Sequence, residues 1–437
     1  MQNMEKFLQA VNQGKYDDRL RRLYVFHDTQ EELEAAREKV SHVIRGFEEA
    51  FPGMNCTCAA VFSGPGRTEI GGNHTDHQHG CVLAGSVNMD ILACVVPTEG
   101  QVAKVVSEGY PELTIDLNDL EVHPEEKNTS AALIRGVAKG IADAGFAPKG
   151  FCAYASSTVP GGSGLSSSAA YEILLGNIFN TFCCEGALDP VKLAQIGQFA
   201  ERNYFGKPCG LMDQAASAIG GVVAIDFNDP GKPVIRKVDY DLARSGYQLY
   251  IIDTRSCHAD LTDDYAGITR EMGAVAAHFG KEVLRDVKEE DFLAAIPAIR
   301  AKTGDRAVLR ALHFFEENRR AQEEAEVLAQ GKMEEFLALV NASGRSSDQL
   351  LQNIWSVSAP DQQAVTLSLA LAEKALAGRG AVRVHGGGFA GTIQAFVPQD
   401  MEKSFVEAME SVLGQGTCHA VSVRPEGGCM IMSSEKE

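Results

Sequence analysis

The chain has 437 residues, of which 45% are hydrophobic and 23% are charged, and its formal net charge is −19. This composition is that of an ordinary globular protein, and the length predicts two domains because a single hydrophobic core seldom grows so large. The excess of acidic residues excludes a broad surface for nucleic-acid polymers, which would need clustered lysines and arginines.

The first half of the chain alternates helical and strand-like patterns. The first 20 residues mix Glu, Lys, Gln and Asp without an apolar core, so no secretory signal is predicted. Apolar residues recur at helical spacing over residues 30–50, and a strand over 58–62 is expected to lead into a Gly-Pro-Gly turn. Further strands are predicted at residues 82–87, 102–106, 113–117, 150–156 and 222–227, and helices at 131–144, 169–182, 190–204 and 212–219.

The second half begins after Asn228-Asp-Pro-Gly231, where four turn-forming residues mark a domain boundary. A strand is predicted at 248–252, long helices dominate residues 264–376, and the end returns to strand, glycine loop, strand, helix and strand. We therefore predict an α+β fold of mixed sheets packed with helices, with an active site in the cleft between two lobes. The predicted parts are an N-terminal extension (1–40), a first domain (41–230) and a second domain (231–437).

The apolar segments and cysteines indicate where the protein resides. The most apolar stretch, residues 81–97, is interrupted by Asn88 and Asp90, so no membrane span is predicted. The 11 cysteines are odd in number and irregularly spaced, without a pair of CxxC units to hold zinc. Reduced thiols in the cytoplasm are the expectation.

The first segment with chemical meaning is Pro160-Gly-Gly-Ser-Gly-Leu-Ser-Ser-Ser-Ala169, between a predicted strand and a predicted helix. Glycines allow successive amide N–H groups to converge on phosphate oxygens, and the helix that follows adds its own unpaired N–H groups. The serines can cap the helix, coordinate Mg²⁺, or both. A Gly/Ser linker or a simple helix cap is the alternative, and the lack of GxxxxGK[ST] excludes a Walker-type loop.

The second segment, His385-Gly-Gly-Gly-Phe-Ala-Gly391, formally satisfies the GxGxxG pattern of dinucleotide-binding proteins. A dinucleotide loop must open a helix, whereas residues 392–397 alternate like a strand. The segment is therefore either a tight turn between strands or a glycine loop that lets another backbone approach closely.

The third segment, residues 64–80, crowds one arginine, three histidines and two acidic groups into what the glycines predict to be a loop. A core cannot absorb so many polar groups without dedicated partners, so they are expected to face a site or solvent. A polyol binder needs such donors and acceptors at fixed angles. The alternative is zinc on His74, His77 and His79.

The fourth segment is Pro208-Cys-Gly-Leu-Met-Asp-Gln214, in which Asp213 stands near the start of a predicted helix. In isolation, the favoured interpretation is a carboxylate interacting with the helix dipole.

Together the four segments resemble the GHMP kinases, and specifically the galactokinases, over nearly the whole chain from about residue 45. Residues 65–67 and 74–76 are similar to that family's sugar-binding stretch, residues 159–170 to its ATP loop, and residues 386–391 to its third glycine motif. The resemblance implies a two-domain GHMP kinase fold and transfer of the γ-phosphoryl group of ATP to the C1 hydroxyl of galactose. It also implies Mg²⁺ as cofactor and no protein partner.

The resemblance further implies roles for individual residues. Asp213 matches the catalytic aspartate and Arg67 the catalytic arginine, while Ser168 and Glu201 match the Mg²⁺ ligands. Sugar contacts are expected from Asn73, His74, Asp76, Gly210 and Tyr265. The nucleotide phosphates are expected at Pro160, Gly161, Gly162, Ser163, Gly164, Leu165, Ser166, Ser167 and Ser168.

Three positions depart from the family pattern. Asn73 replaces a glutamate associated with the C6 hydroxyl of the sugar, His77 replaces a tyrosine, and Glu69 stands where asparagine is usual. The sugar could therefore be a relative of galactose, such as galacturonate, an amino-sugar or a pentose. A sugar sensor without catalysis is the alternative from another class, although the presence of Arg67, Asp213 and the serine loop favours an enzyme.

Overall fold

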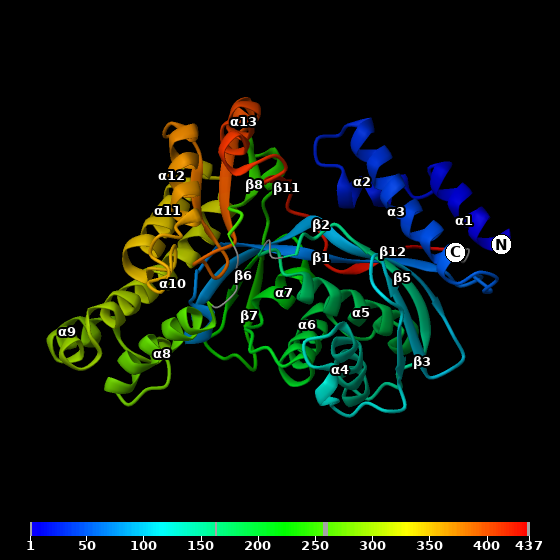
Figure 1. Cartoon of the computed structure of the whole chain (residues 1–437), viewed down its shortest axis with the longest axis horizontal. Coiled ribbons are helices and arrows are strands. Elements are labelled where there is room, and N and C mark those ends of the chain that lie inside the picture. The colour runs from blue at the N-terminus through cyan, green and yellow to red at the C-terminus, as the bar shows by residue number, and fades with distance from the viewer. Residues whose placement is uncertain (1, 162–163, 257–260, 435–437) are drawn as a thin grey trace.

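The computed structural model describes residues 2–161, 164–256 and 261–434, which form two lobes around two β-sheets (Figure 1). None of the helices in these ranges is both long and apolar enough to cross a membrane.

The larger sheet contains eight strands within the described residues and forms the first lobe. Its main path runs β12-β1-β2-β5-β3-β4, with β6 added on β2 and β7 on β6. Every neighbouring pair is antiparallel except β3 and β5. The strands are β1 (Ala60–Gly71), β2 (Cys81–Pro97), β3 (Val102–Ser107), β4 (Leu113–Asp116), β5 (Phe151–Ser157), β6 (Val222–Asp226), β7 (Val234–Val238) and β12 (Cys429–Ser433).

Helices cover both faces of this sheet, as Figure 1 shows. Side chains alternate along β2, so that Leu92, Cys94 and Val96 pack with the N-terminal helices, whereas Ala93 and Val95 pack on the opposite face. The first group of helices is α1 (Gln2–Asn12), α2 (Asp17–Tyr24) and α3 (Gln30–Ala50). The opposite group is α4 (Ser130–Asp143), α5 (Ser167–Cys184), α6 (Pro190–Ala200) and α7 (Met212–Ile219), with a π-helical turn at Glu201–Phe205.

The N-terminal extension is fastened to the sheet through the fully buried Asp90 on β2. The Tyr24 hydroxyl donates to Asp90 Oδ2 at 2.6 Å, Arg424 Nη1 lies 3.0 Å from the same oxygen, and Lys39 pairs with Oδ1. Burial alone would raise the pKa of Asp90, but the charges of Lys39 and Arg424 hold it below its usual value. The extension is thus part of the packed first lobe.

The second lobe is built on a four-stranded antiparallel sheet of order β11-β8-β10-β9. Helices α12 and α13 pack on one face, while α10 and α11 lie on the other and share a core with the first lobe. The strands are β8 (Tyr247–Asp253), β9 (Ala381–His385), β10 (Thr392–Pro398) and β11 (Cys418–Val421). The helices are α8 (Thr262–His278), α9 (Glu289–Thr303), α10 (Asp305–Ala329), α11 (Met333–Ser346), α12 (Ala364–Leu376) and α13 (Glu402–Leu413), with a π-helical turn at Ser347–Leu351.

Two sequence predictions about this organisation differ from the structure. Residues 64–71 are not a loop after a turn, because β1 continues through Gly64-Pro-Gly66 and pairs with β2 across shifts in register. The predicted domain limits do not follow the sheets either. Helix α3 crosses residue 40, β7 pairs with β6 across the limit at 230 and 231, and β12 returns to β1 from the end of the chain.

Candidate active site

Arg67 and Asp213 meet at the centre of the site. Arg67 lies on β1 and Asp213 in the first turn of α7, and Arg67 Nε donates to Asp213 Oδ1 at 2.7 Å. Arg67 also binds the carbonyl oxygen of Gly164, and Ser166 Oγ donates to Asp213 Oδ2 at 2.8 Å. The structure therefore brings the first, third and fourth segments together, and each oxygen of the Asp213 carboxylate has one donor.

The electrostatics keep Asp213 ionised. Burial on its own would raise the pKa of this carboxyl, but the charge and hydrogen bond of Arg67, with smaller contributions from Ser166 and Lys207, hold it below its usual value. An ionised carboxylate next to the glycine–serine loop can accept a proton from a bound hydroxyl.

The glycine–serine loop connects β5 to α5, as the sequence predicts. Its Gly162 and Ser163 lie outside the described residues, whereas Pro160, Gly161 and residues 164–168 are described. Gly164 and Ser166 both have positive φ, +68° and +58°, which turns the chain sharply just before Ser167 begins α5. The Ser166 hydroxyl, which is predicted to lie at the nucleotide, donates to Asp213, a contact that the spacing of the segments does not reveal.

Oxygen atoms converge beside the start of α5. Ser168 Oγ donates to Glu201 Oε1 at 2.8 Å, and Lys207 Nζ lies 3.2 Å from the same oxygen. Gln214 Nε2 bridges Glu201 Oε2 and Glu172 Oε2 at 2.8 and 2.9 Å. The structure thus brings the predicted pair Ser168 and Glu201 together. Glu172 was missed, although it stands four residues after Ser168 and thus on the same side of the helix.

The residues predicted to bind the sugar lie in two groups, one around Gly210 and the other beside the glycine turn at residues 386–388. A β-carbon on Gly210 would overlap the Asp76 carboxylate, so these two residues are in close contact. His74, at φ +57°, places Nε2 2.9 Å from the carbonyl oxygen of Gly387, and the Tyr265 hydroxyl donates to the carbonyl oxygen of Gly388 at 2.9 Å. His74, Asp76 and Gly210 belong to the first lobe, and Tyr265 belongs to the second.

The third glycine segment is a turn that admits another backbone, one of the two alternatives left by the sequence. A β-carbon on Gly388 would collide with the carbonyl oxygen of Asn353. The residues that follow form β10, as their alternation predicts.

Two histidines of the third segment, His74 and His77, are neutral at physiological pH. Burial lowers the pKa of His74 to about 4 and that of His77 to about 3, because a charged imidazole loses its hydration there. Among the described residues, no group of three or more His, Cys, Asp or Glu side chains is arranged to hold a metal ion.

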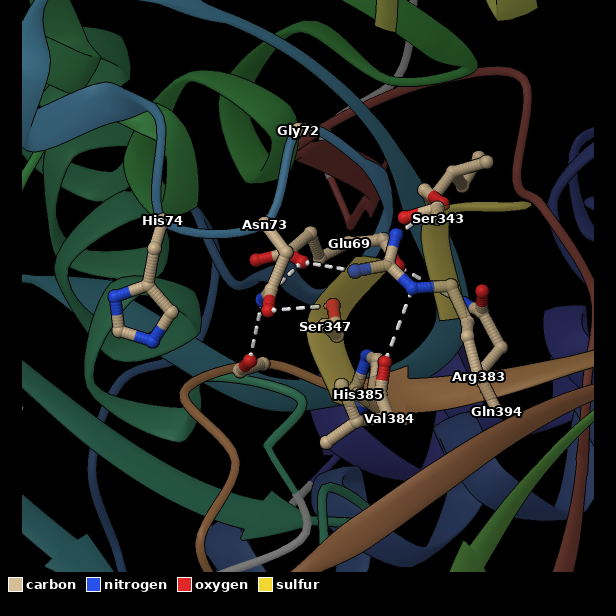
Figure 2. Close-up of polar contacts among 12 residues, drawn as sticks. Glu69, Gly72, Asn73, His74, Ser343, Ser347, Arg383, Val384, His385 and Gln394 are labelled. Atoms are coloured by element: carbon tan, nitrogen blue, oxygen red, sulfur yellow. Dashed lines mark hydrogen bonds and ion pairs between the residues drawn. The ribbon is translucent and has the colours of Figure 1, made fainter. Parts of the chain in front are cut away.

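Asn73 does not lie as the resemblance implied. Its side chain is fully buried, and its hydrogen-bonding groups are occupied by Glu69 and Ser347 (Figure 2) and by Gly386 and Asn353. The prediction that Asn73 contacts the sugar therefore disagrees with the structure, because the amide has no group left to offer.

Two sequence profiles match the chain in the first lobe. Residues 131–221 match the profile described as GHMP kinases N terminal domain, and residues 45–97 match the galactokinase galactose-binding signature. The second match covers Arg67 and the histidine-rich segment, and the first covers the glycine–serine loop and Asp213.

Relatives match over most of the chain. A galactokinase of Streptomyces coelicolor is 30% identical over 355 residues, which cover 80% of this chain and 87% of the relative. A galactokinase of Glaesserella parasuis serovar 5 is 30% identical over 368 residues, with the same two coverages.

Solved structures extend the comparison to the fold. The crystal structure of Lactococcus lactis galactokinase complexed with galactose matches 89% of this chain and 99% of its own, with a TM-score of 0.74 and 25% identity. The Methanococcus jannaschii mevalonate kinase, at 14% identity and a TM-score of 0.59, shares the fold alone. These matches confirm the predicted fold class.

Proposed function

The chain belongs to the galactokinase family of the GHMP kinases, and from this premise we propose how its residues carry the γ-phosphoryl group of ATP to the C1 hydroxyl of galactose. The chain is a phosphotransferase that acts on a sugar hydroxyl. The observation that carries the proposal is the partly buried contact between Arg67 and Asp213 beside the glycine–serine loop. Catalysis of phosphoryl transfer consists mainly of positioning and charge stabilisation, and this pair is placed to supply both.

Asp213 is the proposed proton acceptor. As the sugar oxygen forms its bond to the γ-phosphorus, the bond between that phosphorus and the bridging oxygen of ADP breaks, and the hydroxyl proton passes to Asp213. The hydrogen bonds from Arg67 and Ser166 fix the carboxylate in one orientation. The Arg67 guanidinium is also proposed to stabilise the charge that develops on the transferring group.

The nucleotide phosphates are proposed to lie at the start of α5. There the helix presents its unpaired N–H groups and the positive end of its dipole, next to the glycine–serine loop. Asp76, His74, Gly210 and Tyr265 are proposed to hold the sugar. Burial, and to a smaller extent the charge of Asp213, raise the pKa of Asp76.

Ser168 and Glu201 are proposed to hold Mg²⁺. A hydroxyl and a carboxylate oxygen 2.8 Å apart fit a hard cation, and a buried oxygen of Glu172 without a hydrogen-bond partner among the described residues lies on the same helix. Magnesium commonly takes only one or two protein ligands and completes its shell with substrate phosphates and water. When bound, it would neutralise charge on the β- and γ-phosphate oxygens.

Replacing Glu201 with alanine should raise the Mg²⁺ concentration needed for half-maximal rate by at least about tenfold, because one of two protein oxygens is lost. Calorimetry of Mg²⁺-dependent ADP binding gives a readout that does not depend on turnover. The exposed Glu323, changed to alanine, is the matched control. Unchanged magnesium dependence in both measurements would contradict the assignment.

The proposed substrate is tested by ADP release over a panel of monosaccharides. We expect galactose to give the highest kcat/KM, ahead of galacturonate, galactosamine and arabinose. The comparisons do not favour these alternatives or a silent sensor. A sensor would bind sugar in calorimetry and release no ADP with any member of the panel.

The cytoplasm is the proposed location. The ten cysteines in the described residues are all free thiols, which suits a reducing compartment.

A further inference from the structure

The side chain of Asn73 is directed into the protein at the junction of the two lobes (Figure 2). Its Nδ2 donates to Glu69 Oε1 at 2.9 Å and to the carbonyl oxygen of Gly386 at 2.7 Å. Its Oδ1 accepts from Asn353 Nδ2 at 2.9 Å and from Ser347 Oγ at 3.3 Å. An amide has two N–H donors and one oxygen with two lone pairs, so every hydrogen-bonding position of Asn73 is used.

The backbone around Asn73 is fastened to α10 of the second lobe. The N–H groups of Gly72 and Asn73 both donate to Glu317 Oε1, at 3.1 and 3.3 Å. The carbonyl oxygen of Asn73 lies 2.9 Å from His313 Nε2. Glu317 and His313 are themselves fully buried. These bonds join the strand that carries Arg67 to the second lobe immediately before His74.

Glu69, on β1 and four residues before Asn73, is the third part of this hydrogen-bond network. Its Oε1 accepts from Asn73 and from Arg383 Nη2 at 2.8 Å, and Arg383 on β9 is fully buried. Burial raises the pKa of Glu69, and the charge of Arg383 offsets part of that effect. A second carboxylate at position 73 would face Glu69 and the Gly386 carbonyl oxygen without a proton to donate to either.

We propose that Asn73 is a positioning residue that acts as a pair with Glu69. The two tie the segment between β1 and β2 (residues 72–80, the sugar loop) to the glycine turn at residues 386–388, without contacting the sugar. The pair holds His74, whose Nε2 lies 2.9 Å from the Gly387 carbonyl oxygen, in its left-handed conformation. The galactokinase pattern has asparagine at position 69 and glutamate at position 73. This chain has the two residue types exchanged, as Glu69 and Asn73. The effect on sugar binding rests on the proposed function.

A cycle of four proteins tests the pair: the wild type, Glu69→Asn, Asn73→Glu and the double exchange. Each single exchange leaves two carboxylates or two amides at the junction, whereas the double exchange keeps one of each beside Arg383. We expect either single exchange to raise the galactose KM by about tenfold or more, with kcat within about threefold, and the double exchange to return KM to within about threefold of the wild type. ADP binding should not change in any of them.

The 6-deoxy analogue of galactose separates positioning from direct contact. If Asn73 positions the loop, Asn73→Glu raises KM for galactose and for the analogue by the same factor. A change confined to galactose means that residue 73 touches the C6 hydroxyl, and overturns the proposal. A double exchange no better than the worse single exchange also overturns it. Asn228→Glu, which adds the same charge in an exposed turn, is the matched control and should leave both KM values unchanged.

Thermal unfolding measures the same pair without any substrate. Each single exchange should lower the unfolding midpoint by at least about 3 °C and the double exchange should recover most of that loss. If a single exchange does not fold at all, the double exchange must still fold, and its failure to do so contradicts the pairing. A wild type that folds and phosphorylates no sugar would instead refute the proposed function, and the unfolding cycle would still decide the pairing.

Discussion

Changing Asp213 to asparagine should reduce kcat by about 10²–10⁴-fold while galactose and ATP still bind. Asparagine keeps the shape of the side chain, so its oxygen can still accept from Arg67 Nε and its amide can meet the Ser166 hydroxyl. It cannot take up the proton of the sugar hydroxyl at neutral pH. Steady-state ADP release gives the rate, and calorimetry gives the two binding constants.

The exposed Asp361, changed to asparagine, is the control for this substitution and should leave the rate unaltered. An Asp213→Asn protein that kept more than about a tenth of the wild-type kcat would show that another group accepts the proton. Loss of binding for either substrate would mean that Asp213 chiefly organises the site.

The sequence predicted best the helices whose apolar residues recur at helical spacing within a short stretch of chain. The bounds of α3 and α7 follow from apolar residues at helical spacing, since one face of each helix is buried against the first sheet. The N-terminal helices α1 and α2 were not predicted, although Met4, Phe7 and Val11 are also spaced to lie on one face of a helix. Their stability depends on packing against α3, which a short local pattern does not report.

Local signals failed where distant pairing decides the conformation. Gly64-Pro-Gly66 is a turn by composition, but β2 pairs with β1 on both sides of it, and Pro65 lies opposite Asp90. Pairing along the sheet therefore overrides the turn preference of these residues. The pairing of β12 with β1 is also a contact between distant parts of the chain, which a local pattern does not report.

The order of the segments predicted which residues meet at the site but not which way each one points. Arg67, Ser168, Glu201 and Asp213 come together as the resemblance implied. The direction of Asn73 depends on Glu317, Asn353 and Gly386, which lie at least 244 positions further along the chain. Spacing within the sugar loop contains no information about those partners.

The second large effect is expected at Arg67, whose guanidinium joins three parts of the site. It donates to Asp213 Oδ1, binds the Gly164 carbonyl oxygen of the glycine–serine loop, and has a side chain only 8% exposed. At so buried a position its positive charge acts strongly on Asp213 and is one reason why the pKa of that carboxyl lies below its usual value. Loss of the charge should therefore affect both the rate and its dependence on pH.

Changing Arg67 to leucine should lower kcat by about 10²–10³-fold, since charge on the transferring group loses its donor. Removing the positive charge raises the pKa of Asp213, so the base stays protonated to higher pH and the acid limb of the kcat/KM profile should move upward. Arg67→Lys should lower the rate less and shift the limb less. Arg135→Leu, which removes a buried ion-paired arginine from α4, should not move the limb. A rise in sugar KM alone, with rate and profile intact, would make Arg67 a sugar-positioning residue only.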